Sequence, residues 1–202
     1  NIKNMILKKD FGEIYHIEGD YLHNILHKIT DGWRGKMPFY STVYGGGIHL
    51  IDLMRWLMND EVKEVCAMGN NILTKNTNYK YPEIMTSLLQ FSRGATGKNT
   101  ATYGPQRTKF HSLNIFGTKK SYVNHRGNGE IFSGDSENDL MLDSTPYPGF
   151  LKGDLLPEFI SSIRQDVDPV VTGEDIFRVM DVCFAIWESY KKKKTVEVSY
   201  VL

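Results

Sequence analysis

Four polar side chains interrupt an apolar run that directly follows three consecutive glycines: His49, Asp52, Arg55 and Asn59. Intervals of three, three and four residues place all four on one stripe of a helix. Removing such groups from water is costly unless each of them finds a partner. The stripe is therefore expected to line a cleft, to face another polar element, or both.

His49 lies in the first turn of this predicted helix and could exchange a proton with a substrate hydroxyl. The positive end of the helix dipole lowers the pKa of an imidazole there, and Asp52, one turn further along, could orient the ring. The alternative is a histidine whose hydrogen bonds are satisfied inside the fold, and the residue types alone favour it. For Asp52 and Arg55 the simplest interpretation is an i,i+3 ion pair.

The glycines Gly45, Gly46 and Gly47 permit two interpretations, which the sequence leaves open. Free amides at a helix N-terminus bind anions, which makes these three residues candidate cofactor contacts. Glycines also let a helix pack closely on its neighbours. No dinucleotide or phosphate-loop fingerprint occurs in the chain, and neither does a serine or cysteine nucleophile signature.

No metal site is predicted. His23 and His27 have the i,i+4 spacing of a helical metal pair. Their surroundings, however, have the pattern of a strand followed by a loop, and no third ligand is evident.

The charge balance excludes several classes of partner. Lys and Arg total 24, and so do Asp and Glu, so nothing indicates nucleic acid or an anionic membrane. Lys191–Lys194 is explained by the dipole at a helix C-terminus. No apolar run approaches the roughly 20 residues of a membrane span. Cys66 and Cys183 are predicted to be buried free thiols, in agreement with a reducing, cytoplasmic compartment.

Strand-like runs are grouped together and do not alternate with helices, which indicates a single α+β domain over residues 1–202. We expect an open, mostly antiparallel sheet with helices packed on one face, and with part of the sheet covered on both sides. The expected elements are a short helix 2–9, a strand 13–23, an aromatic-rich loop 24–44, a helix 47–59, strands 62–73, 84–91, 95–103, 110–116 and 121–125, a loop-rich segment 126–150, helices 152–165 and from Thr172, and a last strand 195–200. Consecutive strands with short connections are expected to pair antiparallel.

Tyr44–Leu57 resembles the central signature of the glucose–fructose oxidoreductase, inositol dehydrogenase and rhizopine-catabolism (Gfo/Idh/MocA) oxidoreductases. A glycine-rich turn is followed by G-x-H-x-x-D and by an apolar helix that ends in R-W-L. Three further stretches match in order. They are Phe11–Ile14 at the entry to the family's second domain, the W-R-G loop at Trp33–Gly35, and the closing segment that begins at Val171–Asp175.

The resemblance covers almost the whole chain and implies a dihydrodipicolinate-reductase-like C-terminal domain. In this family that domain forms the substrate pocket and usually the subunit interface, while an N-terminal Rossmann domain binds NAD(P). The resemblance thus implies that the Rossmann domain is absent from this chain. NAD or NADP would be bound mainly by that missing domain. The parent protein would be about 120 residues longer at its N-terminus.

By resemblance, His49 takes the place of the family's active-site histidine. Many members carry an aspartate four residues earlier, where this chain has Gly45. Segments that reach the substrate pocket in relatives contribute Tyr21, His23, Asn24, Trp33, Arg34 and Tyr44 here. Arg34 could pair with a carboxylate or a phosphate.

Two functions follow. The first is the substrate-binding and oligomerisation domain of an NAD(P)-dependent oxidoreductase that acts on a sugar, sugar-nucleotide or cyclitol hydroxyl. Its partners would be a small sugar-like molecule and further copies of the chain, joined through the sheet face as a homodimer or homotetramer. The second is a non-catalytic binding or assembly module that has lost dehydrogenase chemistry, with Gly45 as its main support.

Overall fold

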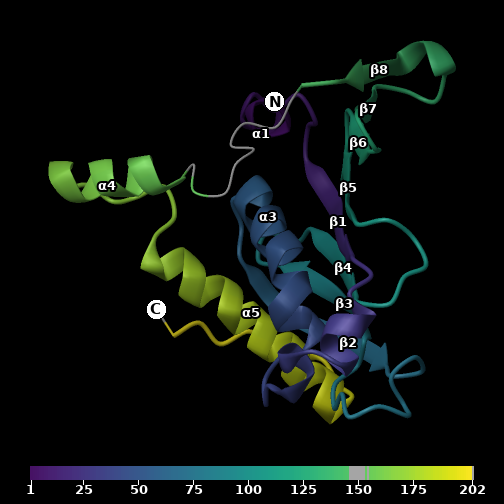
Figure 1. Cartoon of the computed structure of the whole chain (residues 1–202). Coiled ribbons are helices and arrows are strands. Elements are labelled where there is room, and N and C mark those ends of the chain that lie inside the picture. The colour runs from purple at the N-terminus through teal and green to yellow at the C-terminus, as the bar shows by residue number, and fades with distance from the viewer. Residues whose placement is uncertain (146–152, 154, 202) are drawn as a thin grey trace.

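The structure is a computed structural model that describes residues 1–145, 153 and 155–201. Its strands form one nine-stranded sheet in the order β8-β7-β6-β5-β1-β4-β3-β2-β9 (Figure 1). The strands are β1 (Ile14–Leu22), β2 (Val62–Asn70), β3 (Ile84–Phe91), β4 (Thr96–Thr102), β5 (Phe110–Gly117), β6 (Ser121–Asn124), β7 (Gly129–Phe132), β8 (Leu140–Asp143) and β9 (Val196–Glu197). The helices are α1 (Ile2–Leu7), α2 (Leu26–Thr30), α3 (Ile48–Met58), α4 (Leu155–Gln165) and α5 (Gly173–Lys192).

The first strand lies in the middle of the sheet. β1 pairs parallel with β4 on one side and antiparallel with β5 on the other, and every other strand pair is antiparallel. The prediction of a mostly antiparallel α+β fold is confirmed. Antiparallel pairing of consecutive strands is wrong at one place, because β1 inserts between β4 and β5.

Helices α3 and α5 cover one face of the sheet (Figure 1). The core between these layers contains Ile17, Met54, Leu89, Ile115 and Val182, all of them buried. Apolar residues every three to four positions give each helix the stripe that packs there. Burial of this stripe against the sheet holds the start of α3 in place over the ends of β1 and β4.

The opposite face of the sheet is open in the single chain. Met68 on β2 and Leu88 on β3 are 77% and 60% exposed on this face. The expectation that part of the sheet is covered on both sides is therefore wrong within one chain. Cys66 also lies on this face and is only half-buried, whereas Cys183 is buried, and both thiols are free.

Two segments predicted as loops carry regular structure. Within 24–44 the chain forms α2, a 3-10 turn at Trp33–Lys36 and a π-helical turn at Val43–Gly47 that leads directly into α3. Within 126–150 it adds β7 and β8 at the edge of the sheet, since glycine-rich spacing conceals short edge strands. The predicted loop residues 146–150 lie outside the described part, as do residues 152 and 154 of the helix expected over 152–165.

The predicted start of the long C-terminal helix is confirmed. Thr172 and Asp175 form a capping box, with the Thr172 hydroxyl bonded to the Asp175 amide at 3.1 Å. The last strand is shorter than expected and covers only β9. Helix α4 projects away from the sheet (Figure 1), and its apolar side chains are exposed, including Leu155 and Ile163 at 63% and 65%. No helix in the described part of the chain is both long and apolar enough to cross a membrane.

Candidate functional site

His49 stands exposed on the first turn of α3, and its ring stacks on that of Tyr21 from β1 with centroids 5.8 Å apart. The ring of His111 on β5 also stacks on that of Tyr21, with centroids 4.9 Å apart. The Tyr21 hydroxyl lies 2.9 Å from Nδ1 of His23. We call these four residues, Tyr21, His23, His49 and His111, the histidine cluster. It joins three segments that are far apart in the sequence.

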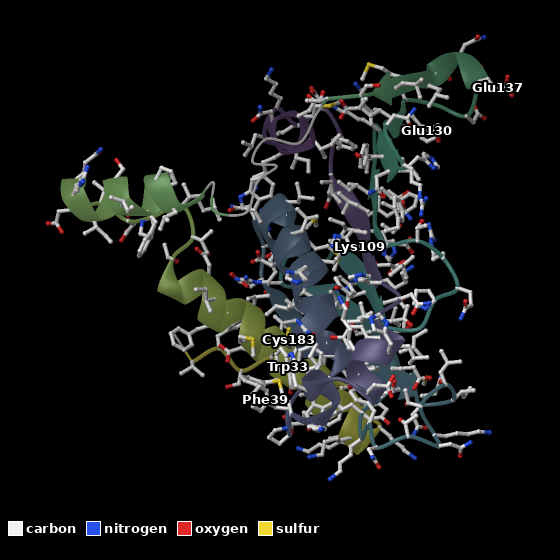
Figure 2. All side chains as sticks on the ribbon, in the orientation of Figure 1. Trp33, Phe39, Lys109, Glu130, Glu137 and Cys183 are labelled. Carbon is white, nitrogen blue, oxygen red and sulfur yellow. The ribbon has the colours of Figure 1, made fainter. Side chains whose placement is uncertain are left out.

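Strand geometry brings these side chains to the helix-covered face. Successive strand residues alternate between faces, so Tyr21 lies on the same side of β1 as buried Ile17. The sheet register pairs Tyr21 directly with His111. The loop between β4 and β5 carries Lys109, two residues before His111, and Figure 2 labels it at the level of α3.

The glycines let the start of α3 press against the sheet. A Cβ atom on Gly46 would lie 2.6 Å from Cδ1 of Tyr21, and one on Gly47 would lie 2.8 Å from Oδ1 of Asn99. Both distances are too short for any other residue without a shift of the neighbours. The Gly45 amide donates to the Ser41 carbonyl at 3.0 Å inside the π-helical turn. These contacts support the close-packing interpretation of the glycines.

The side chains of Tyr40 and Tyr103 lie against Gly45, and we call this pair the tyrosine wall. A Cβ atom on Gly45 would lie 2.2 Å from the Tyr103 hydroxyl oxygen and 2.8 Å from Cζ of Tyr40. The Tyr103 ring is fully buried, stacks on Tyr40 at 6.0 Å, and its hydroxyl donates to the Ser41 carbonyl at 3.3 Å. Burial raises the pKa of Tyr103 far above its ordinary value, so the hydroxyl stays neutral. A side chain at position 45 would thus meet the hydroxyl-bearing rings of Tyr40 and Tyr103.

The three histidines share a lowered pKa. Burial and then the charge of Lys109 lower the pKa of His111 to about 4. Desolvation and Lys109 also lower the pKa of His23 and of His49, where Asp52 opposes the shift. The cluster is therefore neutral at neutral pH, and a neutral imidazole has one nitrogen that can take a proton and one N–H that can donate a hydrogen bond.

One atom of the cluster has unused hydrogen-bonding capacity. Nε2 of His111 is buried and has no hydrogen-bond partner among the described residues. A buried polar atom without a partner is unfavourable and calls for an explanation such as a ligand.

The remaining polar residues of the helix stripe line a separate cleft. Arg55 is only 7% exposed and donates from Nε and Nη2 to the two carboxylate oxygens of Glu61, each at 2.8 Å. Arg178 lies 3.4 Å from the same carboxylate, and Asp52 lies 3.8 Å from Arg55. This arginine cleft has a volume of about 720 Å³ and is lined by Asp52, Arg55, Trp56, Asn59, Asp60, Glu61, Ser92, Arg93, Val170, Val171 and Asp175.

The predicted stripe therefore lines a cleft and meets polar partners, as expected. The predicted pair of Asp52 and Arg55 exists, but Glu61 is the stronger partner and was missed. Glu61 follows the left-handed residue Asn59 that ends α3, so helix spacing did not reveal it.

The other predicted site residues divide between two environments. Asn24 is exposed just beyond β1, and Trp33 is 61% exposed with the Arg34 guanidinium stacked 4.5 Å from its ring centroid. The charge of Arg34 opposes the rise in the pKa of Tyr21 that burial causes. Tyr44 instead packs against Phe184 and Trp187 of α5, away from the cluster.

Sequence reasoning missed His111 and Lys109. For His111 a signal was present, since it lies in the strand predicted at 110–116, where alternate residues share a face. Lys109 lies in the loop before this strand and gave no such signal. Within the described residues, no three His, Cys, Asp or Glu side chains are grouped so that they could hold a metal ion.

A family model described as the GFO/IDH/MocA C-terminal domain matches residues 1–123. No curated protein sequence matches the chain. The fold is similar to that of levoglucosan dehydrogenase solved in complex with NADH, with a TM-score of 0.81 and 21% identity over 99% of this chain and 62% of that one.

Two further solved structures are similar to the chain. WlbA dehydrogenase from Bordetella pertussis, in complex with NADH and UDP-GlcNAcA, has a TM-score of 0.76 and 19% identity over 98% of this chain and 59% of that one. Scyllo-inositol dehydrogenase from Lactobacillus casei, with bound NAD(H) and scyllo-inositol, has a TM-score of 0.76 and 19% identity over 97% and 60%. The chain spans about three fifths of the length of these proteins. At such identities the likeness shows the fold alone.

Proposed function

The chain belongs to the GFO/IDH/MocA family, and from this membership we propose that it is the C-terminal, substrate-binding domain of an NAD(P)-dependent oxidoreductase. The proposed substrate is a hydroxyl group of a sugar, sugar nucleotide or cyclitol. The observation that carries the proposal is His49, exposed at the start of α3 and stacked on Tyr21 within a neutral histidine cluster.

The proposed role of His49 is to take the proton of the substrate hydroxyl during oxidation. Its lowered pKa keeps the imidazole neutral at neutral pH and thus able to accept that proton. NAD(P), when bound, supplies the acceptor for the hydride. Tyr21 supports the ring of His49 by stacking, and its own hydroxyl is engaged with His23.

The chain's own contribution to cofactor binding is limited in this proposal. The Gly45 amide is used by the Ser41 carbonyl, which leaves it unable to bind a diphosphate. We therefore assign the dinucleotide mainly to a Rossmann domain outside this chain, and to this chain only contacts near the start of α3, at the exposed His49. The isolated 202-residue chain is expected neither to bind NAD(H) at micromolar concentration nor to turn over.

The test is an assay of the full-length protein for NAD⁺ and NADP⁺ reduction with a panel of sugars, sugar nucleotides and cyclitols. The expected result is cofactor reduction at 340 nm with at least one member of the panel, and none with the isolated chain. Micromolar NAD⁺ binding to the isolated chain in calorimetry would contradict the division of roles.

A second function, a non-catalytic binding or assembly module, is favoured by one observation. The tyrosine wall leaves no room for the family's aspartate at Gly45. The same assay separates the two functions: the module would bind a sugar without any cofactor reduction in the full-length protein.

Oligomerisation through the open sheet face is a further part of the proposal. Exposed Met68 and Leu88 support it, because apolar side chains of this size gather at interfaces. Light scattering after size exclusion is expected to give a homodimer or homotetramer, and Leu88→Lys is expected to give a smaller species. The control is Ile72→Lys, which changes a 67% exposed residue in the β2–β3 connection. An unchanged mass for Leu88→Lys would remove this assignment.

A cytoplasmic location is also proposed, with the two free thiols as its support. Cell fractionation followed by immunoblotting tests it, and recovery of the protein in the secreted fraction would overturn it.

A further inference from the structure

The unpartnered Nε2 of His111 lies in a basic part of the site. Lys109 lies in the loop directly before β5, two residues from His111, and its charge lowers the pKa of His111, His49 and His23. The charges of Lys109 and of Lys28 on α2 lower the pKa of His23. The charge of Arg34 opposes the rise in the pKa of Tyr21 that burial causes. Permanent positive charges from three segments therefore act on the rings of the cluster.

Among the described residues, few negative charges act on the same rings. The carboxylate whose charge acts on His49 is Asp52, and this group lies 3.8 Å from Arg55 in the neighbouring cleft. Gly45 supplies no carboxylate, and the hydroxyls of Tyr40 and Tyr103 occupy the space where one would stand. No carboxylate of the described residues stands beside Gly45 to repel an anion, because the Tyr40 and Tyr103 hydroxyls fill that space.

We propose that the ligand of this site is an anionic sugar whose carboxylate or phosphate group is bound by His111 and Lys109 while His49 faces the reacting hydroxyl. The inference rests on the proposed function, since it names the substrate class of the same site. Nε2 of His111 donates a hydrogen bond to the anion, which satisfies the buried atom. The Lys109 ammonium adds the charge that distinguishes a sugar acid from a neutral sugar.

The test is calorimetry on the full-length protein saturated with NAD⁺, with matched pairs of probes. D-glucuronate is compared with D-glucose, and D-galacturonate with D-galactose, while D-glucose 6-phosphate distinguishes a phosphate from a carboxylate. We expect the charged member of a pair to bind at least tenfold more tightly than the neutral one, and the difference to shrink as salt is added.

Charge variants locate the effect. Lys109→Gln and His111→Gln are each expected to weaken binding of the charged sugar about tenfold and to leave the neutral sugar within twofold. Lys119→Gln is the matched control, because it removes an exposed lysine from the other end of β5. It is expected to change neither affinity.

The outcomes separate this inference from the proposed function. Equal affinity for charged and neutral sugars overturns the inference and leaves the sugar site standing. A Lys109→Gln effect on NAD⁺ affinity in place of sugar affinity also overturns it, since the charge would then serve the cofactor. Binding of none of the five probes overturns the inference, while the proposed function is overturned only if the full panel of sugars, sugar nucleotides and cyclitols also gives no cofactor reduction.

Discussion

The two ends of helix α3 carry polar groups of the same stripe but use them differently. At the cleft end, Arg55 is buried and both of its forked donors meet Glu61 at 2.8 Å. At the other end, His49 is exposed and His111 keeps a buried nitrogen without a partner among the described residues. The cleft has a volume of about 720 Å³, yet its charges are already paired. The histidine cluster is the part with hydrogen-bonding capacity left for a ligand.

The comparison teaches that cavity size and chemical availability are separate properties. A buried bidentate pair fixes the end of a helix, and disrupting it costs stability. Neutral imidazoles with lowered pKa values contribute less to folding and remain available for proton transfer. Substitutions at the two ends should therefore change different measurements.

The largest expected effect is at Gly45 and tests whether the histidine cluster is built without a carboxylate. Gly45→Asp should destabilise the fold by more than about 3 kcal/mol, because the new side chain collides with Tyr103 and Tyr40 and buries a charge. Urea denaturation measures the loss. Gly173→Asp is the control, since nothing lies within 4 Å of that position at the start of α5. Recovery of part of the stability in Gly45→Ala on adding Tyr103→Phe would locate the collision.

The second largest expected effect concerns the Arg55–Glu61 pair at the cleft end of α3. Arg55→Met should cost about 2–3 kcal/mol of unfolding free energy, because Glu61 loses its forked partner in a partly buried place. Lys192→Met is the control, because its pair with Glu188 is exposed and should contribute little to the unfolding free energy. Equal losses of unfolding free energy in the two variants would mean that the Arg55–Glu61 pair stabilises the fold no more than an exposed ion pair does.

The third prediction is that the titration of His111, in the histidine cluster, makes the unfolding free energy depend on pH. The pKa of His111 is about 4 in the folded chain, below the ordinary histidine value. Its neutral form thus stabilises the fold above about pH 6.5. That stability is lost as the pH falls from about 6.5 towards 4. After allowance for partial exposure, wild type should lose about 1–2 kcal/mol more than His111→Gln over this window.

Urea titrations at several pH values measure that difference. His125→Gln is the matched variant, since His125 is half-exposed and pairs with Glu130 at 2.9 Å on the edge hairpin. Parallel pH curves for wild type and His111→Gln would contradict the lowered pKa.

The smallest effect concerns the residue between the two ends. The Asp52 side chain is 57% exposed, and its Oδ1 lies 3.8 Å from Nη1 of Arg55. Asp52→Asn should change the unfolding free energy by less than about 0.5 kcal/mol. It should also lower the pKa of His49 further, because the Asp52 charge raises that value. Histidine ring signals in an NMR titration report the shift, and an unchanged His49 titration would separate Asp52 from the cluster.

Local patterns predicted the parts of this fold that local physics determines. The stripe of α3, the capping box at Thr172 and the strands predicted at 84–91 and 110–116 follow from spacing and residue type. The insertion of β1 between β4 and β5 could not be predicted, because strand pairing across about 80 residues leaves no local signal.

The same distinction applies to the site. His49 was identified from its helix and from the family resemblance, while His111 reaches it only through sheet register. The filling of the space at Gly45 depends on Tyr40 and Tyr103, which approach from two different segments. A glycine in the sequence does not disclose whether the space beside it is open or occupied.

The central claim is that the histidine cluster, and not the arginine cleft, performs the chemistry. It is tested most directly by kcat/KM of His49→Ala in the full-length protein, with the unfolding free energy measured alongside. We expect kcat/KM to fall at least about a hundredfold, as for loss of a general base, with stability within about 0.5 kcal/mol of wild type. A kcat/KM within twofold of wild type would contradict the account.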